Sequence, residues 1–528
     1  MKTMNLALGE LDTLHLSLTY RDDPTALYHT LCGDRAHSLL LESAEIATKQ
    51  AQKSLMLVDA ALRIHCLAST ITLSALSNNG QNLIRLIERA LPVLGDAIAK
   101  QETQMENGYC CLILTLAPVS RALDEDARLH QPSVLSVLRL LRTELELRGH
   151  RDEALFVGGI FGYDLVASFE PLPEVARRNQ CPDYLFFVAE TLLVLDHQSQ
   201  KMHLQGTIFG GEQVTENYFE LSRRIQQLSE QAQLVTALPK AQQVAMPSVQ
   251  TDISDAAFCD TVEKLKSHVV AGDIFQVVPS RTFSLPCPSP LQAYHALKQR
   301  NPSPYMFYLQ DRDFTLFGAS PESALKYSQQ SNQVEIYPIA GTRPRGKNSD
   351  GSINFDLDGR IELELRSDKK ELAEHMMLVD LARNDVARIS SAGSRHVADL
   401  LKVDRYSHVM HLVSRVVGQL QPKLDALHAY QACMNMGTLS GAPKIRAMQL
   451  IREVEQKQRG SYGGAVGYLT GAGDMDTCIV IRSAYVENEI AYVQAGAGVV
   501  YDSQPQAEAD ETRAKAQAVL SAITAAHA

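Results

Sequence analysis

The sequence predicts an α+β fold whose sheets are mixed and largely antiparallel. Short apolar runs typical of strands lie between helical stretches, and the regular strand–helix alternation of a doubly wound parallel sheet is missing. Glycine and proline separate many of the apolar runs, as expected for strands joined by turns. Apolar residues make up 45% and charged residues 21% of the 528 residues, which is typical of a globular protein with a sizeable core.

The amino-terminal part of the chain mixes both kinds of element. Helices are expected at 81–100 and 133–148, and strands at 39–41, 112–116 and 185–195. Residues 226–250 are rich in Gln, Ala and Ser and lose the strand pattern, so they predict the end of a helix followed by a linker. This change in composition predicts two regions, at 1–235 and 250–525.

The second region repeats the mixture without a regular order. Helices are expected at 255–271, 368–390, 424–434, 443–457 and 508–525. Strands are expected at 275–278, 305–309, 314–318, 334–339, 464–469, 477–486, 490–495 and 498–501.

Charge and composition exclude several classes of function. The formal net charge of −11 argues against non-specific binding of nucleic acid, so local basic groups must hold any anionic substrate. We expect no membrane span, because no apolar run has the required length. We expect no signal peptide, because the first residues carry Glu10 and Asp12 and lack a clean apolar core. The nine cysteines are scattered without a C-x-x-C motif, which argues against a zinc ribbon or a disulfide framework and fits a reducing cytoplasm.

Two pairs of glutamates with E-x-x-E spacing carry the strongest chemical signal. Glu371 and Glu374 stack on one face of an expected helix, and the next turn, Met376–Val379, is apolar nearly all round, as in a buried helix. Glu508 and Glu511 open a second helix. Carboxylates beside a buried helix are costly to desolvate unless they bind something, and an all-carboxylate site suits Mg²⁺. The alternative is that both pairs lie on solvated first turns, where the helix dipole favours acidic residues.

Glycine-rich and basic positions lie between and after these pairs. The segments GSYGGAVGY (460–468) and AGAG (495–498) either point backbone N–H groups at an anion or form tight turns. Arg482 interrupts an apolar strand and suits capture of a carboxylate. Lys444 in GAPK is either a second cationic group or simply part of a helix start. His411 lies on an apolar face, where it is either a core residue or a base.

Taken together, these motifs resemble those of the chorismate-utilising enzymes. The matching segments are AGDIFQVVPSR (271–281), GASPE (318–322), PIAGTRPRG (338–346), the run 371–385, GAPK (441–444), GSYGGAVGY, QAGAG (494–498) and EADET (508–512). The match is looser upstream, through LLLES (39–43) and VGGIFGYDLVASFE (157–170). In detail the motifs resemble the branch of the family that forms anthranilate. The resemblance implies the family's fold, a two-layer core of largely antiparallel sheets flanked by helices.

The resemblance also implies how the site residues divide the work. Glu374 and Glu511 would ligate Mg²⁺, which holds the ring carboxylate of chorismate, with Glu371 and Glu508 close to the metal. Glu371 would be the general acid for the departing 4-hydroxyl. The substrate's carboxylates would be held by residues rich in donors: Gly341, Thr342, Tyr462, Arg482, Gly496 and Gly498, with Lys444 nearby. Such donors suit a dianionic substrate in an acidic chain.

Within the family, two positions decide which reaction follows. Relatives that add water to form isochorismate have a lysine base where this chain has Gln276, and a neutral amide cannot activate water. Relatives that form aminodeoxychorismate commonly carry a nucleophilic lysine where this chain has Ala340. Both residues therefore favour direct amination at carbon 2, followed by loss of pyruvate, with His411 matching the histidine that takes the carbon-2 proton. Component I of aminodeoxychorismate synthase, with a substitute for the lysine, is the nearest alternative.

A partner and an inhibitor are implied as well. No cysteine lies in a G-x-C-x-G nucleophile elbow, so a glutaminase site is missing from the sequence. The family takes ammonia from a separate glutamine amidotransferase subunit, which implies a heterotetramer. LLES (40–43) matches the family's site for inhibition by tryptophan, although LLLES could equally be a core strand. The full set implied for that site is Glu42, Ser43, Lys53, Pro304, Tyr305, Met306, Gly467 and Tyr468. A tryptophan-sensing protein that has lost catalysis is a second alternative.

Overall fold

Strands from both halves of the chain join one continuous network of sheet. The computed structural model describes residues 5–44, 51–118, 124–147, 154–244, 246–406 and 409–527. In it, β2 (Ser38–Ala44) pairs with β14 (Tyr305–Gln310), and β8 (Phe156–Phe161) pairs with β22 (Ala465–Thr470). Among the described strands every ladder is antiparallel except the short pair of β1 with β7. The predicted mixture of helices and largely antiparallel sheet is therefore confirmed.

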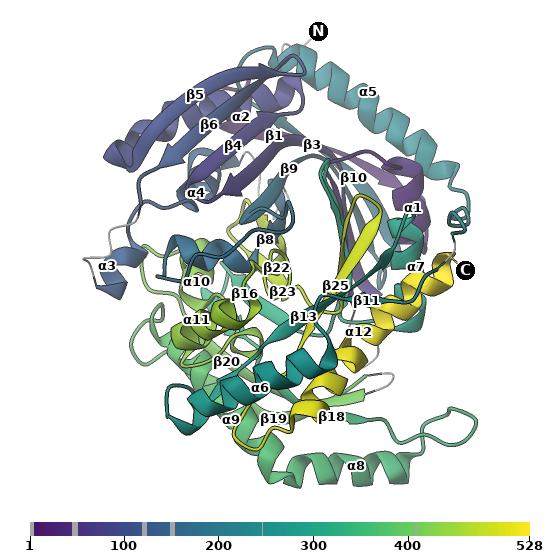
Figure 1. Ribbon diagram of the computed structural model, residues 1–528. Coiled ribbons are helices and arrows are strands. Elements are labelled where there is room, and N and C mark those ends of the chain that lie inside the picture. The colour runs from purple at the N-terminus through teal and green to yellow at the C-terminus, as the bar shows by residue number, and fades with distance from the viewer. Residues whose placement is uncertain are drawn as a thin grey trace.

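The amino-terminal half contributes a strongly paired set of strands (Figure 1). Besides β2 and β8, its strands are β1 (Glu10–Leu18), β3 (Ala51–Leu67), β4 (Thr70–Ala75), β5 (Ile98–Glu106), β6 (Tyr109–Leu116), β7 (Glu146–Leu147), β9 (Tyr184–Asp196) and β10 (Lys201–Phe209). Its helices are α1 (Pro24–Leu31), α2 (Asn78–Ala90), α3 (Glu125–Leu129), α4 (Ser136–Glu144) and α5 (Val214–Gln233), with 3-10 turns at Leu91–Ala97 and Tyr163–Ser168. Between α5 and β11 (Gln250–Thr251) the described residues form no helix or strand, as the linker prediction requires.

The carboxyl-terminal half adds the remaining elements. Its further strands are β12 (Gln276–Val277), β13 (Ser280–Pro286), β15 (Thr315–Ser320), β16 (Ser323–Ser328), β17 (Gln333–Ile336), β18 (Ile339–Pro344), β19 (His396–Arg405), β20 (Val409–Gln419), β21 (Gly441–Ala442), β23 (Met475–Ile479), β24 (Ser483–Glu487) and β25 (Ile490–Gly496). Its helices are α6 (Asp255–Val270), α7 (Pro290–Arg300), α8 (Phe355–Ser367), α9 (Lys369–Ala387), α10 (Ala426–Cys433), α11 (Lys444–Glu455) and α12 (Pro505–His527), with a 3-10 turn at Gly437–Leu439.

Several predicted boundaries were wrong for local reasons. The helix expected at 81–100 ends at Ala90, because a 3-10 turn containing Pro92 and Gly95 (φ 51°) follows it and leads into β5. The strand expected at 477–486 is divided into β23 and β24 by a break at Arg482, whose φ is 51°. The strand expected at 498–501 is reduced to a single bridge between Val277 and Val499.

The apolar residues form layers that explain this arrangement. One buried cluster consists almost entirely of strand residues, among them Leu57, Phe187, Phe307 and Val466, and so lies between facing parts of the sheet. Two larger clusters pack helices onto the sheet, with α2, α4, α9 and α10 contributing to one and α1, α5, α7 and α12 to the other. None of the helices in the described ranges has the length and apolar character needed to cross a membrane.

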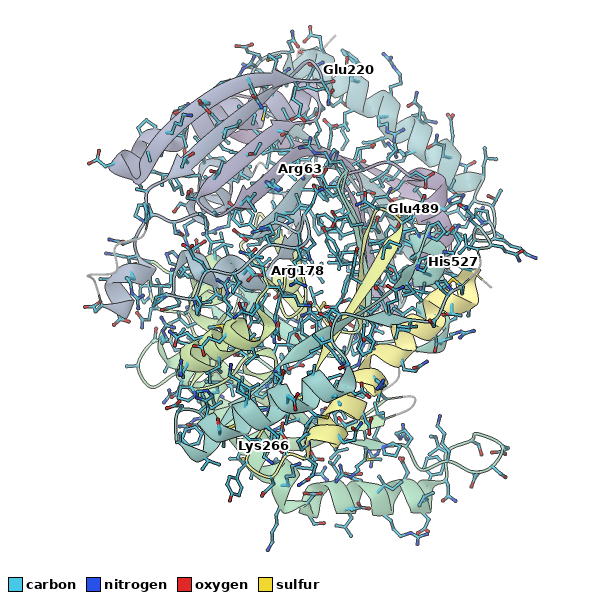
Figure 2. The ribbon with its side chains drawn as sticks, viewed as in Figure 1. Arg63, Arg178, Glu220, Lys266, Glu489 and His527 are labelled. Atoms are coloured by element: carbon cyan, nitrogen blue, oxygen red, sulfur yellow. The ribbon has the colours of Figure 1, made fainter. Side chains whose placement is uncertain are left out.

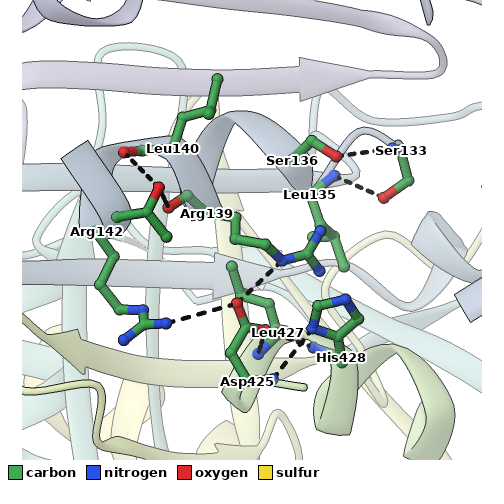
Figure 3. A network of polar contacts seen from close by, with 10 residues as sticks. Ser133, Leu135, Ser136, Arg139, Leu140, Arg142, Asp425, Leu427 and His428 are labelled. Carbon is green, nitrogen blue, oxygen red and sulfur yellow. Dashed lines mark hydrogen bonds and ion pairs between the residues drawn. The ribbon is translucent and has the colours of Figure 1, made fainter. Parts of the chain in front are cut away.

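Polar contacts also tie the two halves together. Asp425 caps α10 by accepting hydrogen bonds from the backbone N–H groups of Leu427 and His428, and Arg139 of α4 donates to the same carboxylate at 3.0 Å (Figure 3). Burial works against the ionised form, but His428 and Arg139 outweigh it and hold the pKa of Asp425 well below its usual value. Strand pairs and ion pairs thus join the two halves of the chain. The predicted division at 235–250 stays a prediction.

Candidate active site

The two predicted glutamate pairs lie in the first two turns of α9 and α12. Asp368 caps α9 through the backbone N–H groups of Lys370 and Glu371, which places Glu371 and Glu374 at its start. Burial, then the charges of Glu371 and Glu511, raise the pKa of Glu374. Carboxylates from both helices therefore lie close enough to repel each other, as the predicted shared site requires.

The prediction that the helix is apolar and buried all round was wrong. Leu378 and Val379 are buried, but Met376 is 43% exposed, so α9 buries only one side. The side that carries Glu371, Glu374 and Leu378 follows helical spacing and faces the interior of the site.

Basic and amide side chains partner three of the four carboxylates. Arg343 donates to Glu371 at 2.7 Å, and the amide of Gln276 donates to Glu374 at 3.2 Å. Lys515 lies 2.6 Å from Glu511 and donates to the backbone carbonyl of Gly496 at 3.0 Å. Although burial acts in the opposite direction, Lys515 holds the pKa of Glu511 below its usual value.

The fourth carboxylate, Glu508, is buried, and this burial raises its pKa. In the described ranges no three acidic, histidine or cysteine side chains converge into a preformed metal site. The donor set nevertheless fits a hard cation, because Glu374 and Glu511 repel each other and the buried Oε1 atom of Gln276 has no hydrogen-bond partner among the described residues. Binding a cation would relieve the repulsion.

Strands β18 and β20 supply the histidine. Gly341, in a bulge of β18 with φ of 82°, lets Thr342 turn toward β20, where its hydroxyl is 2.9 Å from Nδ1 of His411. A side chain at Gly341 would have its Cβ 3.2 Å from Glu371, so the bulge lies directly beside α9. Burial, then the charge of Arg482, lower the pKa of His411 to about 4. The imidazole is thus neutral at physiological pH, the form that can accept a proton.

The opposite wall combines an arginine, a tyrosine and close backbone. In the part of the chain that the structure describes, the guanidinium of Arg482 has no hydrogen bond or ion pair, although Tyr462 and Glu511 are near enough to affect its pKa. A Cβ at Gly496 would lie 2.9 Å from the Tyr462 hydroxyl, and one at Gly498 would lie 2.7 Å from Gln276. The glycines therefore keep open a space bordered by donors, as expected for an anion.

One predicted residue is not brought to the site. Lys444 donates to Asp385 at 2.6 Å and to the carbonyl of Cys433 at 2.9 Å, so its charge is already paired. Asp385 lies about 16 Å beyond Glu374 along α9 at 1.5 Å per residue. Lys444 thus ties α9 to α11, and its position agrees with the simpler interpretation as part of a helix start.

Two residues that sequence reasoning missed belong to the site. Lys515 lies one turn after Glu511, a spacing that could have indicated it. Glu322 follows β15 and is 7% exposed, accepting a hydrogen bond from Thr438 at 2.9 Å. Burial raises the pKa of Glu322 to about 8, although Arg482 and Lys515 oppose the shift. Glu322 therefore holds a proton at neutral pH.

A second pocket contains most of the residues implied for tryptophan. Antiparallel pairing places Ser43 opposite both Tyr305 of β14 and Lys53 of β3. The pocket has about 450 Å³ of empty space, partly open to solvent, and is lined by Leu41, Glu42, Ser43, Lys53, Leu55, Tyr305, Met306, Phe307, Val466, Gly467, Tyr468, Asp476 and Cys478. Pro304 does not line it, and its carbonyl accepts a hydrogen bond from Ala44.

Asp476 is the charged group of this pocket that sequence reasoning missed. Burial raises its pKa to about 6, and the hydroxyl of Tyr305 donates to it at 3.4 Å. Nothing in the sequence marks it, because it lies in β23, more than 400 residues from Ser43. The fold brings the two together through Tyr305, which pairs with Ser43 and bonds to Asp476.

Comparison with known proteins agrees with this geometry. The model of the family described as chorismate binding enzyme matches residues 98–521. The chain belongs to this family. It is 65% identical over 517 residues to anthranilate synthase component 1 of Vibrio cholerae, covering 98% of this chain and 97% of that protein. It is 59% identical to anthranilate synthase component 1 of Escherichia coli, with 98% of each chain covered.

Solved structures place the fold in the same family of chorismate-binding enzymes. Anthranilate synthase component I from Streptococcus pneumoniae superposes with a TM-score of 0.65 at 30% identity, covering 89% of this chain and 92% of that one. The menaquinone-specific isochorismate synthase of Escherichia coli superposes with a TM-score of 0.67 at 15% identity, over 99% of this chain and 96% of that one. The second likeness shows the fold alone.

Proposed function

We propose that this chain is the chorismate-converting component of an anthranilate synthase. It would combine chorismate with ammonia to give anthranilate, pyruvate and water. The observation that carries the proposal is the meeting of three features in one site: the Thr342–His411 pair, the guanidinium of Arg482, which is unpaired among the described residues, and carboxylates from α9 and α12. The names of its full-length relatives support the same reaction.

Substrate binding follows from charge. Chorismate carries two carboxylates, and the acidic chain offers it Arg482, the Tyr462 hydroxyl and the backbone beside Gly496 and Gly498. Glu374 and Glu511 would hold Mg²⁺, with Glu371 and Glu508 beside them. The bound metal would supply positive charge for the ring carboxylate, which four glutamates alone would repel.

Proton transfer is assigned to two groups. Glu371, the general acid that the resemblance implies, accepts a hydrogen bond from Arg343, which holds its carboxylate against a cation. We therefore assign the proton for the departing 4-hydroxyl to Glu322, whose pKa is raised to about 8. As ammonia forms its bond to carbon 2, the carbon–oxygen bond at carbon 4 breaks and water leaves.

The second step restores aromaticity. His411, neutral and held by Thr342, would remove the proton from carbon 2 while the bond between the ring and the enolpyruvyl oxygen breaks. The departing group takes up a proton at carbon and becomes pyruvate. The ring that remains is anthranilate, so all atoms of chorismate and ammonia are accounted for.

Residues at two positions favour this reaction over those of other relatives. Gln276 is 2% exposed and bonded to Glu374, and its neutral amide cannot activate water. Ala340 in β18 provides no nucleophile for a 4-amination route. Ammonia needs no base to attack. In the cell, a glutamine amidotransferase subunit would supply it in a heterotetramer, and tryptophan would inhibit by binding the pocket at Ser43.

One assay tests these statements together. The purified chain is incubated with Mg²⁺, chorismate and ammonium chloride, and anthranilate fluorescence and pyruvate are measured with and without tryptophan. The proposal expects equal amounts of both products and their suppression by tryptophan. A 4-amino product without pyruvate would indicate an aminodeoxychorismate synthase component. Tryptophan binding without any turnover would indicate a sensor.

A further inference from the structure

The strand that borders the tryptophan pocket is bonded on its other face to a helix. Successive side chains of β2 point to opposite faces of the sheet, so those of Leu41 and Ser43 face the pocket. Glu42 contributes to the pocket lining, but its carboxylate lies on the other face, with Leu40. The Glu42 carboxylate is 7% exposed. It accepts one hydrogen bond from the Tyr294 hydroxyl at 2.5 Å and one from Lys298 Nζ at 2.6 Å, both on α7.

Helix α7 in turn lies along α12, the helix that carries Glu508 and Glu511. Apolar side chains from the two helices share one buried cluster, including Leu291, Tyr294 and Leu297 from α7 and Val519 and Ile523 from α12. Polar contacts add to it: Arg300 donates to the carbonyl of Ser521 at 3.3 Å. The backbone N–H of Ser289 donates to His527 at the carboxyl end of α12 at 3.1 Å (Figure 2).

The amino-terminal end of α12 is positioned separately from this contact. Lys266 of α6 donates to the carbonyl of Ser503 at 2.7 Å, two residues before α12 begins (Figure 2). Helix α7 contacts the other end of α12. A displacement of α7 would therefore tilt α12 about the end held by α6 and change the position of Glu511 relative to Glu374 on α9. The affinity of the site for a cation and for a dianionic substrate depends on the distance between these two carboxylates.

We propose that Tyr294 and Lys298 are the positioning residues through which an occupant of the pocket acts on the carboxylates of α12. The inference rests on the proposed inhibition by tryptophan. A buried carboxylate held by two short bonds is costly to detach, so a shift of β2 at Ser43 carries Tyr294 and Lys298 with it. Close-packed helices transmit such a shift rather than absorb it. Tryptophan would weaken chorismate binding without touching it.

The test uses two variants that keep packing and remove only the polar link. Tyr294→Phe deletes the hydroxyl, and Lys298→Met keeps the aliphatic stem. Tyr308→Phe is the matched control, because Tyr308 lies in the same cluster, 5.7 Å from the ring of Tyr294, and bonds to Gln310 instead of Glu42. Tryptophan binding is measured by calorimetry. The KM for chorismate is measured with ammonium chloride and Mg²⁺, without tryptophan and at a saturating concentration for each variant.

Wild-type chain and control should show the same increase of KM at saturating tryptophan, within the roughly 5- to 150-fold range usual for coupled sites. In the two variants this increase should fall at least fivefold, while the KM without tryptophan stays within twofold. Tryptophan should still bind, and chorismate should no longer weaken its binding, since coupling is reciprocal. Full wild-type coupling in both variants would overturn the inference, and so would loss of tryptophan binding itself. A wild-type chain that tryptophan does not inhibit would overturn the proposed regulation instead.

Discussion

Replacing Glu322 by glutamine separates its catalytic role from its structural one. Glutamine has the same shape and can keep the hydrogen bond with Thr438, but it cannot transfer a proton. If Glu322 protonates the departing hydroxyl, the rate of anthranilate formation should fall by roughly 10²- to 10⁴-fold, the usual contribution of a general acid. In the wild type, activity should decline as the pH rises through about 8, the pKa to which burial raises this group.

The same substitution has a consequence for stability whose size follows from the structure. The pKa of Glu322 is raised from 4.5 to about 8, so the folded chain holds a proton that the unfolded chain releases above pH 4.5. Stability from this group is therefore fully present below pH 4.5 and is lost as the pH rises toward 8, by about 1.4 kcal/mol per pH unit. Between pH 5.5 and pH 8 the loss amounts to about 3 kcal/mol, and Glu322→Gln should not show it.

Urea unfolding of both proteins at the two pH values measures this difference, alongside a pH–rate profile of anthranilate formation. The difference in unfolding free energy between variant and wild type should change by about 3 kcal/mol in favour of the variant as the pH rises. A difference that stays constant with pH would show that Glu322 is not protonated in the fold. Full activity of the variant would leave the proton to another group.

Four further outcomes are expected. His411→Asn should lower anthranilate formation by about 10²-fold or more and release aminodeoxyisochorismate with its enolpyruvyl group intact, as mass spectrometry can detect; unchanged anthranilate yield would exclude His411 as the base. Ser43→Phe should fill the pocket, leaving turnover near normal and abolishing inhibition by tryptophan; retained inhibition would place the inhibitor elsewhere. Lys444→Met should leave Asp385 buried and unpaired, costing about 3 kcal/mol in urea unfolding with KM for chorismate unchanged, whereas a large rise in KM would return Lys444 to the substrate site. Removal of divalent cations by EDTA should abolish activity, and added Mg²⁺ should restore it. The Glu374→Gln variant should need a roughly tenfold higher Mg²⁺ concentration for the same effect, and activity that survives chelation would contradict the carboxylate site.

Residues within one motif could be placed from the sequence because local spacing decides their geometry. The E-x-x-E pairs on α9 and α12 and the helix start at GAPK depend on a few neighbouring residues, and the structure has them as expected. Arg482 was also found, although its break in the strand was not. A left-handed residue between two strands is set by the neighbours that β23 and β24 pair with, which no local pattern reveals.

The roles of residues whose neighbours come from distant segments could not be predicted from the sequence. Glu322 was visible only as part of a motif, because its raised pKa comes from burial under parts of the chain far away in sequence. Lys444 looked available, since Asp385 lies 59 residues before it and meets it only when α9 and α11 pack together. Sequence spacing thus located the charges but not their partners, and partners decide whether a charge binds substrate.

The pairing of β2 with β14 and of β8 with β22 has a consequence for how the chain acquires its fold. Leu40 pairs with Tyr308 and Gly159 with Gly467, so the ladders join residues separated by roughly 270 and 310 positions. Contacts between such distant residues close large loops, which makes folding slow and leaves β14 and β22 as unpaired edges until the amino-terminal strands are in place. A fragment beginning near residue 250 should therefore aggregate through these edges, and co-expression of residues 1–249 should rescue it. The amino-terminal half would then act as the template on which the catalytic half completes its sheet.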